Sequence, residues 1–316
     1  MLVLSRSQVE ELLDLDALVE AVGAAQADLS VGAASMPPRI AALVSEREGL
    51  LGVMPAYLPS AGLACKLVTL FPRNRDRHTH QAAIMVFDPD NGSPVALMDG
   101  TYITATRTAA ASALATRLLA REDASVLAVL GSGVQAQSHG RALARVRDFT
   151  EVRVAARDPA GAEALARELG GRAVSSWEEA LDGADVVAAT THADEPVVRR
   201  EWLSPGVHVN SVGLNQSGRE VDEATVAEAL LVVESRVSTL APPPAGAPDL
   251  AGVSPEHVYA ELGELVRGDR PGRTSRDQIT LYKSVGVAVQ DVAAASLVLH
   301  AARARGIGTD IDLEAE

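Results

Sequence analysis

The spacing of apolar residues changes twice along the chain, at about residue 39 and again at about residue 125. Residues 7–30 carry apolar positions on a helical period and predict two short helices, with a break near Leu13–Asp16 that Asp14 or Asp16 could cap. Residues 39–99 contain short apolar runs between turn-forming residues, and the Asp-Pro-Asp-Asn-Gly segment at 88–92 indicates a hairpin. This stretch predicts a mostly antiparallel sheet, followed by an alanine-rich helix over 102–120.

From residue 125 the pattern alternates between short apolar runs and amphipathic segments. The run Val126–Leu130 is apolar throughout, as in a strand buried on both faces. Such alternation predicts a parallel sheet with right-handed crossovers. The fold class is therefore α/β, with a Rossmann-type dinucleotide-binding domain and an α+β domain with a mostly antiparallel sheet. Further strands are expected at 151–156, 172–174, 184–189, 206–212 and 230–233, and a final long helix is expected over 277–304.

The composition is that of a globular chain with a large core. Of the 316 residues, 47% are apolar, and the formal net charge is −14. A strongly acidic chain is a poor partner for nucleic acid or an anionic membrane, so neither is expected. The single cysteine, Cys65, excludes an internal disulfide, and the early acidic residues are atypical of a signal peptide. A cytoplasmic protein is expected.

Lysine is rare in this chain. Only Lys66 and Lys283 occur, against 26 arginines. Lysine carries a compact ammonium whose pKa responds to its surroundings, whereas arginine stays charged. Each remaining lysine is therefore a candidate for a role that arginine cannot fill, although chance alone could also leave two.

A glycine-rich turn follows the first strand of the second half. Gly131-x-Gly133-x-x-Ala136 lies between the strand Val126–Leu130 and a helix, which is the context of a pyrophosphate-binding turn. The next strand ends in Ala155-Ala156-Arg157-Asp158, with Ala156 where an acid for the ribose would stand. Arg157 could bind a 2′-phosphate, which favours NADPH; alternatively, Asp158 binds the ribose hydroxyls and the cofactor is NADH.

Three cations of the first half stand among apolar residues. Arg39 follows two prolines, Lys66 lies inside an apolar strand, and Arg107 lies in a nearly uncharged helix. Burying such groups is costly unless an anion accompanies them. They predict a site for a substrate carboxylate, with ordinary ion pairs as the alternative.

The strands at 184–189 and 206–212 end in polar segments. Thr190-Thr191-His192 and Ser211–Asn215 are expected at the carboxyl edge of the parallel sheet, where ligands bind. His78-x-His80 lacks further ligands at metal-binding spacing, so no metal is predicted, and His80 is expected to border a pocket.

Taken together, these segments resemble the ornithine cyclodeaminase/mu-crystallin family over nearly the whole chain, and most closely its mu-crystallin branch, which includes NADPH-dependent ketimine reductases. The matching stretches are Leu51–Tyr57, Lys66–Thr69, His80–Ala82, Met98–Gly100, Ile103–Ala110, Gly131–Ala136, Asn210–Gly213, Arg219–Glu220, Ala260–Glu264 and Lys283–Gly286.

The resemblance implies a homodimer with a substrate and dimerisation domain at 1–118, joined by the C-terminal helix 289–316, and a dinucleotide-binding domain at 119–288. It also implies that Arg39, Lys66 and Arg107 hold the substrate carboxylate. The residues implied near the cofactor, besides Gly131, are His80, Thr108, Gly133, Val134, Gln135, Arg157, Thr190, Val212 and Ser284.

One position departs from the cyclodeaminases that this chain resembles. They carry a proton-transferring Asp where this chain has Asn215, and an amide cannot ionise. The expected activity is therefore NADPH-dependent reduction of an α-imino carboxylate, with Lys66 and Asn215 as the catalytic candidates. A cyclodeaminase or an NAD-dependent amino-acid dehydrogenase is the first alternative, and a non-catalytic, crystallin-like binding protein is the second.

Overall fold

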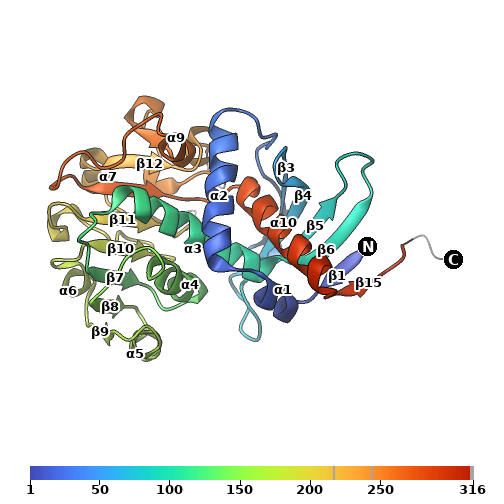
Figure 1. Ribbon diagram of the computed structural model, residues 1–316. Helices are drawn as coiled ribbons and strands as arrows, with labels where there is room; N and C mark the ends of the chain where they lie inside the picture. Colours follow the sequence, from blue (N-terminus) through green and yellow to red (C-terminus); the bar gives the residue numbers. More distant parts are fainter. Residues whose placement is uncertain (216–217, 243–244, 314–316) are drawn as a thin grey trace. The chain divides into compact units, whose positions relative to one another are not determined.

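The computed structural model describes residues 1–215, 218–242 and 245–313, which form two compact units (Figure 1). The first unit is Met1–Arg107 with Val287–Glu316, and the second is Thr108–Gly286. The division falls inside helix α3 (Gly100–Leu119), at Arg107 rather than at the predicted residue 118. None of the helices in the described ranges combines the length and the apolarity that a membrane crossing requires.

The first unit is built on a seven-stranded sheet in the order β15-β1-β6-β5-β4-β3-β2. All neighbours are antiparallel except β1 and β6, which are parallel, so the predicted, mostly antiparallel sheet is confirmed. The predicted hairpin at 88–92 joins β5 to β6. The strands are β1 (Leu2–Leu4), β2 (Ile40–Val44), β3 (Gly49–Leu58), β4 (Gly62–Leu70), β5 (His80–Phe87), β6 (Pro94–Asp99) and β15 (Thr309–Asp310).

Helices cover one face of this sheet. Helix α10 (Ala288–Arg305) packs on β3, β4 and β5 and against α2 (Leu15–Ser30), while α1 (Arg6–Leu12) precedes α2 (Figure 1). The predicted break between the first two helices is confirmed, because the Asp14 carboxylate accepts a hydrogen bond from Ala17 N at 2.8 Å and caps α2.

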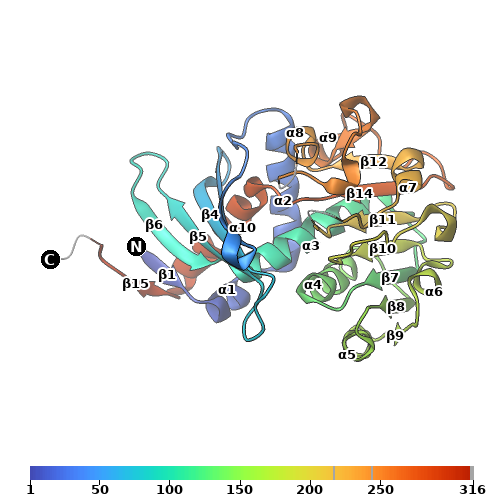
Figure 2. The same ribbon diagram turned by 180° about the vertical axis from the view of Figure 1, so that it is seen from behind.

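Figure 2 shows the sheet from behind. Large apolar side chains are exposed on its other face. Alternation along the strands places Ile40, Leu51, Tyr57 and Leu67 on this face, whereas Lys66 points to the α10 side. Ile40 is 68% exposed and Leu67 is 42% exposed. Exposed apolar patches of this kind are typical of interaction surfaces.

The second unit holds an eight-stranded sheet in the order β13-β12-β14-β11-β10-β7-β8-β9, parallel throughout. The chain runs outward from β7 through β8 to β9 and then returns to β10 on the other side of β7. The strand order therefore reverses between β7 and β10, where doubly wound sheets bind their ligands. The strands are β7 (Val126–Leu130), β8 (Glu151–Ala155), β9 (Arg172–Ala173), β10 (Val186–Ala189), β11 (His208–Ser211), β12 (Leu230–Val233), β13 (Ala260–Glu261) and β14 (Thr280–Lys283).

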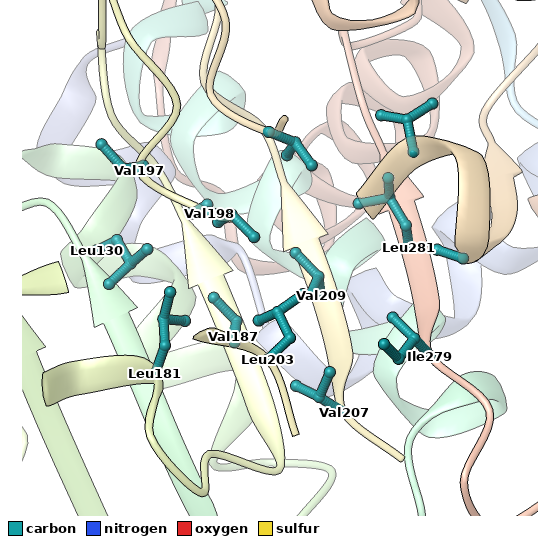
Figure 3. Packing of buried hydrophobic residues seen from close by; sticks show 14 of the residues in the cluster. Leu130, Leu181, Val187, Val197, Val198, Leu203, Val207, Val209, Ile279 and Leu281 are labelled. Atoms are coloured by element: carbon teal, nitrogen blue, oxygen red, sulfur yellow. The ribbon is translucent and has the colours of Figure 1, made fainter. Parts of the chain in front are cut away.

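The core of this unit lies on both faces of the parallel sheet. Leu130 of β7, Val187 of β10 and Leu281 of β14 project toward the same face of the sheet, and Leu181 lies beside Leu130 and Val187 (Figure 3). On the opposite face, Asn210 Nδ2 donates to Thr116 Oγ1 of α3 at 2.9 Å. The helices are α4 (Val134–Leu143), α5 (Pro159–Glu168), α6 (Trp177–Leu181), α7 (Glu223–Glu228), α8 (Arg236–Thr239) and α9 (Leu262–Arg267), with short 3-10 turns at Ser45–Arg47, Arg200–Trp202, Pro248–Leu250 and Pro255–His257.

The predicted final helix over 277–304 is wrong in its first third. Residues 280–283 form β14, a central strand between β11 and β12, and the helix begins only at Ala288. The strand is buried on both faces. Its lysine, Lys283, makes the segment look too polar for a buried strand, but in the structure Asp249 neutralises this lysine inside the protein. The remaining expected strands lie where the pattern placed them, within two residues at either end.

Candidate functional site

The glycine-rich turn follows the carboxyl end of the central strand β7, at the point where the strand order of the second unit's sheet reverses. Gly131 has φ +113°, and a Cβ there would lie 2.8 Å from Thr190 Oγ1, so only glycine fits. Gly133 caps α4, and nothing lies within 4 Å of where its Cβ would be. The exposed start of α4 thus offers its first backbone N–H groups to an anion.

Two side chains at this turn also fit a bound dinucleotide. Val134, the first residue of α4, is an exposed apolar side chain. Gln135 Oε1 is buried and has no hydrogen-bond partner among the residues that the structure describes. Buried polar atoms are rarely left in this state unless a ligand or water completes them. The turn 131–136 therefore has the space, the donors and an unsatisfied acceptor for a nucleotide cofactor.

The end of β8 separates the two candidates for the adenosine ribose. Asp158 caps α5: its Oδ1 accepts from Ala160 N at 3.2 Å, and its carboxylate is thus already engaged. Arg157 is exposed beside it, and no ion pair to Arg157 is found within the described residues. This arrangement leaves a cation at the position where the sequence analysis expects a phosphate.

A buried network ties the loops after β10 and β11 together. Glu220 accepts hydrogen bonds from Thr191 N (2.6 Å), Ser211 Oγ (2.7 Å) and Gly213 N (2.8 Å). Lys283 Nζ lies 2.7 Å from Asp249 Oδ2 and donates to Ser211 Oγ and Gly213 O, each at 2.9 Å. These contacts fix the backbone on either side of Val212.

The other predicted cofactor residues of the second unit also take part in internal bonds. Thr190 Oγ1 donates to Leu130 O at 2.8 Å, which links the ends of β10 and β7. Ser284 Oγ donates to Glu234 Oε1 at 2.9 Å, while Thr108 is buried in α3. Asn215 Nδ2 donates to Ala193 O (3.1 Å) and to Asp194 Oδ1 (2.8 Å), so this amide joins its own loop to the one after β10.

The first unit brings the two strongest cationic candidates together on one carboxylate. Lys66 of β4 lies with its Nζ 2.7 Å from Asp291 Oδ2, and Arg107 Nε lies 3.0 Å from Asp291 Oδ1. Arg107 Nη1 also donates to Gln290 Oε1 at 2.9 Å. Lys66 and Asp291 are each only 2% exposed. The ion pairs that the sequence left open as an alternative do exist, but both cations share a single anion.

Electrostatics show that this cluster has a surplus of positive charge. Burial and the nearby charges of Arg107 and Arg39 lower the pKa of Lys66, which Asp291 only partly restores, to about 8. Burial, Lys66 and Arg107 likewise lower the pKa of His80 to about 4, so this imidazole is neutral at pH 7. Arg107 and Lys66 hold the pKa of Asp291 below its usual value despite burial. Lys66 and Arg107 thus share one carboxylate, and a second carboxylate would balance this buried pair of cations better.

Sequence reasoning missed Asp291 and Gln290. Both lie in an otherwise apolar stretch of α10. A single acid in such a stretch is as unusual as the single arginine that made Arg107 a candidate, so the same reasoning could have identified Asp291. It also missed Asp249, Glu220 and Glu234, whose buried carboxylates bind backbone N–H groups and have no distinguishing spacing. Within the described ranges, no group of three metal-ligating side chains is present.

Comparison with known proteins agrees with this architecture. The family model described as "Ornithine cyclodeaminase/mu-crystallin family" matches residues 1–306. Ketimine reductase mu-crystallin of Mus musculus is 40% identical over 305 residues, covering 93% of this chain and 95% of that protein.

Two solved structures have the same fold over their whole length. Thermococcus litoralis Δ1-pyrroline-2-carboxylate reductase, in complex with NADH and L-proline, matches with a TM-score of 0.93 and 37% identity, covering 98% of this chain and 100% of that one. An archaeal alanine dehydrogenase dimer with bound NAD matches with a TM-score of 0.89 and 32% identity, covering 99% of each chain. The predicted fold class is confirmed, and the chain belongs to the ornithine cyclodeaminase/mu-crystallin family.

Proposed function

We propose that this chain reduces an α-imino carboxylate, either a cyclic ketimine or an imine of an α-keto acid, to the amino acid, with NADPH as the reductant. The observation that carries the proposal is the surplus of positive charge around Asp291 in the first unit. The names of the relatives support it, because they include a ketimine reductase and a Δ1-pyrroline-2-carboxylate reductase. The chain is an NAD(P)-dependent oxidoreductase in this proposal, as in its family.

Arg39, Lys66 and Arg107 bind the substrate carboxylate in this proposal. The ammonium and the two guanidiniums supply charge-assisted hydrogen bonds, which are among the strongest in proteins. Burial strengthens them, since water competes little at a site where Lys66 is 2% exposed. An imine without a carboxylate would leave this charge unbalanced and would therefore bind poorly.

When bound, NADPH would supply a hydride for the imine carbon. The C=N electron pair would move to nitrogen, which must gain a proton if it does not already carry one. A protonated imine is the better acceptor, because hydride attack neutralises its positive charge. With a pKa of about 8, Lys66 is mostly protonated at pH 7 and can orient or supply that proton. Asn215 can only hydrogen-bond, and we assign it to the nitrogen end of the substrate without acid–base work.

The turn 131–136 fits the pyrophosphate of the cofactor, and Thr190, Val212 and Ser284 are proposed to border it. Arg157 is exposed, whereas Asp158 is occupied as the cap of α5. This division of roles favours the 2′-phosphate of NADPH over the free ribose of NADH. His80, neutral at pH 7, is proposed to approach the nicotinamide without adding charge.

A second copy of the chain is the proposed partner of the exposed sheet face that carries Ile40, Leu51, Tyr57 and Leu67. The dimeric state of the archaeal alanine dehydrogenase supports this assignment. The uncovered face is apolar along three neighbouring strands, which suits the self-complementary contact of a two-fold dimer. We propose that the protein is a homodimer that works in the cytoplasm.

A substrate panel followed at the nicotinamide absorbance band tests the function. The proposal expects NADPH oxidation with Δ1-pyrroline-2-carboxylate, Δ1-piperideine-2-carboxylate, or pyruvate plus an amine. Ammonia release from ornithine with no net change in absorbance would instead assign a cyclodeaminase. NADPH binding without turnover of any substrate would assign a binding protein.

A further inference from the structure

We infer that Asp291 is a positioning residue of the proposed reductase: its carboxylate holds the Lys66 ammonium and the Arg107 guanidinium in the arrangement that receives the substrate carboxylate. The inference rests on the proposed function and adds a residue of α10 to the carboxylate site. Asp291 lies in the first turn of α10, on a different element from either cation.

The geometry gives each oxygen of Asp291 one partner. Oδ1 accepts from Arg107 Nε at 3.0 Å, and Oδ2 lies 2.7 Å from Lys66 Nζ. The carboxylate therefore joins β4, α3 and α10 through charged contacts that are almost fully buried. Neither cation can turn away without leaving a buried charge unpaired, which is costly.

Gln290, the preceding residue, completes the support of Arg107. Its Oε1 accepts from Nη1 at 2.9 Å, so two of the three guanidinium nitrogens are engaged within the protein. A guanidinium has five N–H donors in a rigid plane, and fixing two nitrogens fixes the direction of the third. We assign Nη2 to the substrate.

Asp291 also sets the charge state of Lys66. The charged groups that shift the pKa of this ammonium are Asp291 from α10, Arg107 from α3 and Arg39 before β2. His80 of β5, whose own pKa Lys66 lowers to about 4 together with burial and Arg107, is neutral at pH 7. Asp291 alone among them raises the pKa of Lys66, whereas burial and the two arginines lower it. Removing the carboxylate should therefore release the proton of Lys66 at a lower pH.

A purely structural role makes a different prediction. An acid in the first turn of a helix stabilises the helix through its dipole, and Asp291 occupies such a position. Loss of that effect alone would lower the melting temperature and leave the KM for the imine and its pH profile unchanged.

The test is Asp291→Asn, assayed as the full-length protein with Δ1-pyrroline-2-carboxylate and NADPH. The inference expects KM for the imine to rise roughly 10- to 100-fold, as for other residues that orient a binding group. It also expects the alkaline fall of kcat/KM to move to lower pH, and the Kd for NADPH to stay within about twofold. Asp291→Glu restores the charge and should return the alkaline fall toward that of the wild type.

Asp249→Asn is the matched control, since it removes the acid from the other buried lysine–aspartate pair. It should lower the melting temperature without moving the alkaline fall. If Asp291→Asn is insoluble, Gln290→Met takes its place and should raise KM roughly 3- to 10-fold with no change in the pH profile. An unchanged KM in either variant would overturn the inference.

Failure of the proposed function has a different signature. In that case the wild type turns over no imine, and binding of L-proline, measured by calorimetry in the presence of NADPH, replaces KM as the readout. Weaker L-proline binding by Asp291→Asn would then still support the positioning role, and equal binding would overturn it.

Discussion

The only two lysines of the chain are both buried against an aspartate, yet the charges around them differ. Lys66 and Arg107 share Asp291, and Arg39 adds further positive charge. Lys283 instead faces Asp249 and donates to Ser211 Oγ and Gly213 O, close to a second acid, Glu220. In the first cluster two buried cations share one carboxylate, whereas in the second cluster the lysine has its hydrogen-bond and ion-pair partners within the protein.

The difference separates a binding site from a scaffold. A buried cation that its own protein neutralises has no need of a ligand, and Lys283 accordingly fastens the loop that carries Val212. A cluster with surplus charge is stabilised by an incoming anion, and this is the property that a carboxylate site requires. The rarity of lysine drew attention to both residues, but only the charge balance distinguishes their roles.

The sharpest contrast comes from removing each lysine in turn. Lys66→Met should lower kcat/KM for the imine roughly 100-fold or more, because truncating one member of a desolvated charge cluster costs several kcal/mol of binding. Asp291 keeps Arg107, so the protein should stay folded. Steady-state kinetics with saturating NADPH measure the loss, and full activity would remove Lys66 from the mechanism.

Lys283→Met should affect stability instead. Asp249 would lose its cation while 4% exposed, and breaking a buried pair costs about 3–5 kcal/mol. The melting temperature should fall by roughly 10 °C. Calorimetry of the two methionine variants side by side provides the comparison, and a larger fall for Lys66→Met would contradict it.

A change at the nucleotide turn should leave carboxylate binding alone. Arg157→Ala should weaken NADPH binding roughly tenfold or more and leave NADH binding nearly unchanged, since a hydrogen-bonded charge is worth about 1.5–3 kcal/mol. KM for the imine should not move. The ratio of NADPH to NADH affinities measures the effect, and an unchanged ratio would favour ribose binding by Asp158.

The pH dependence should report on Lys66. Only the protonated ammonium attracts a carboxylate, so kcat/KM should be level below pH 8 and fall about tenfold per unit above it, given a pKa of about 8 for Lys66. The profile of Lys66→Met should lack this fall. A wild-type profile that stays flat to pH 10 would show that Lys66 does not bind the substrate as an ammonium.

The smallest effect on chemistry is expected outside both clusters. Ile40→Asp together with Leu67→Asp places charge on the exposed sheet face and should shift the protein from dimer to monomer in sedimentation velocity. The melting temperature should fall only slightly, because both side chains are already exposed in the single chain. A wild-type monomer would contradict the proposed homodimer, and a dimer that survives both substitutions would place the interface elsewhere.

Much of the fold follows from local sequence. Apolar period, turn residues and the cap at Asp14 are local signals, and they place most elements of both units within a few residues. Strand β14 escaped because its boundary depends on tertiary burial: Lys283 looks like an end to the apolar run until Asp249, 34 residues earlier, neutralises it. The short strands β1, β13 and β15 carry too few residues for any period to show.

The candidate site likewise contains residues that the sequence identifies and residues that only the folded structure reveals. Lys66 and Arg107 could be identified because a charge in an apolar run is unusual, and the glycine turn has a strict spacing. Their shared partner could not be identified, since Asp291 is 184 residues from Arg107 and only folding brings them together. Charge balance is a property of the assembled cluster, so no segment of the sequence contains it.

The most direct test of the surplus-charge account compares two imines that differ only in the carboxylate, Δ1-pyrroline-2-carboxylate and Δ1-pyrroline, as substrates for NADPH oxidation. The account predicts that kcat/KM for the acid exceeds that for the unsubstituted ring by roughly 100-fold or more in the wild type, and that Lys66→Met removes most of the difference. Equal values for the two imines in the wild type would contradict it.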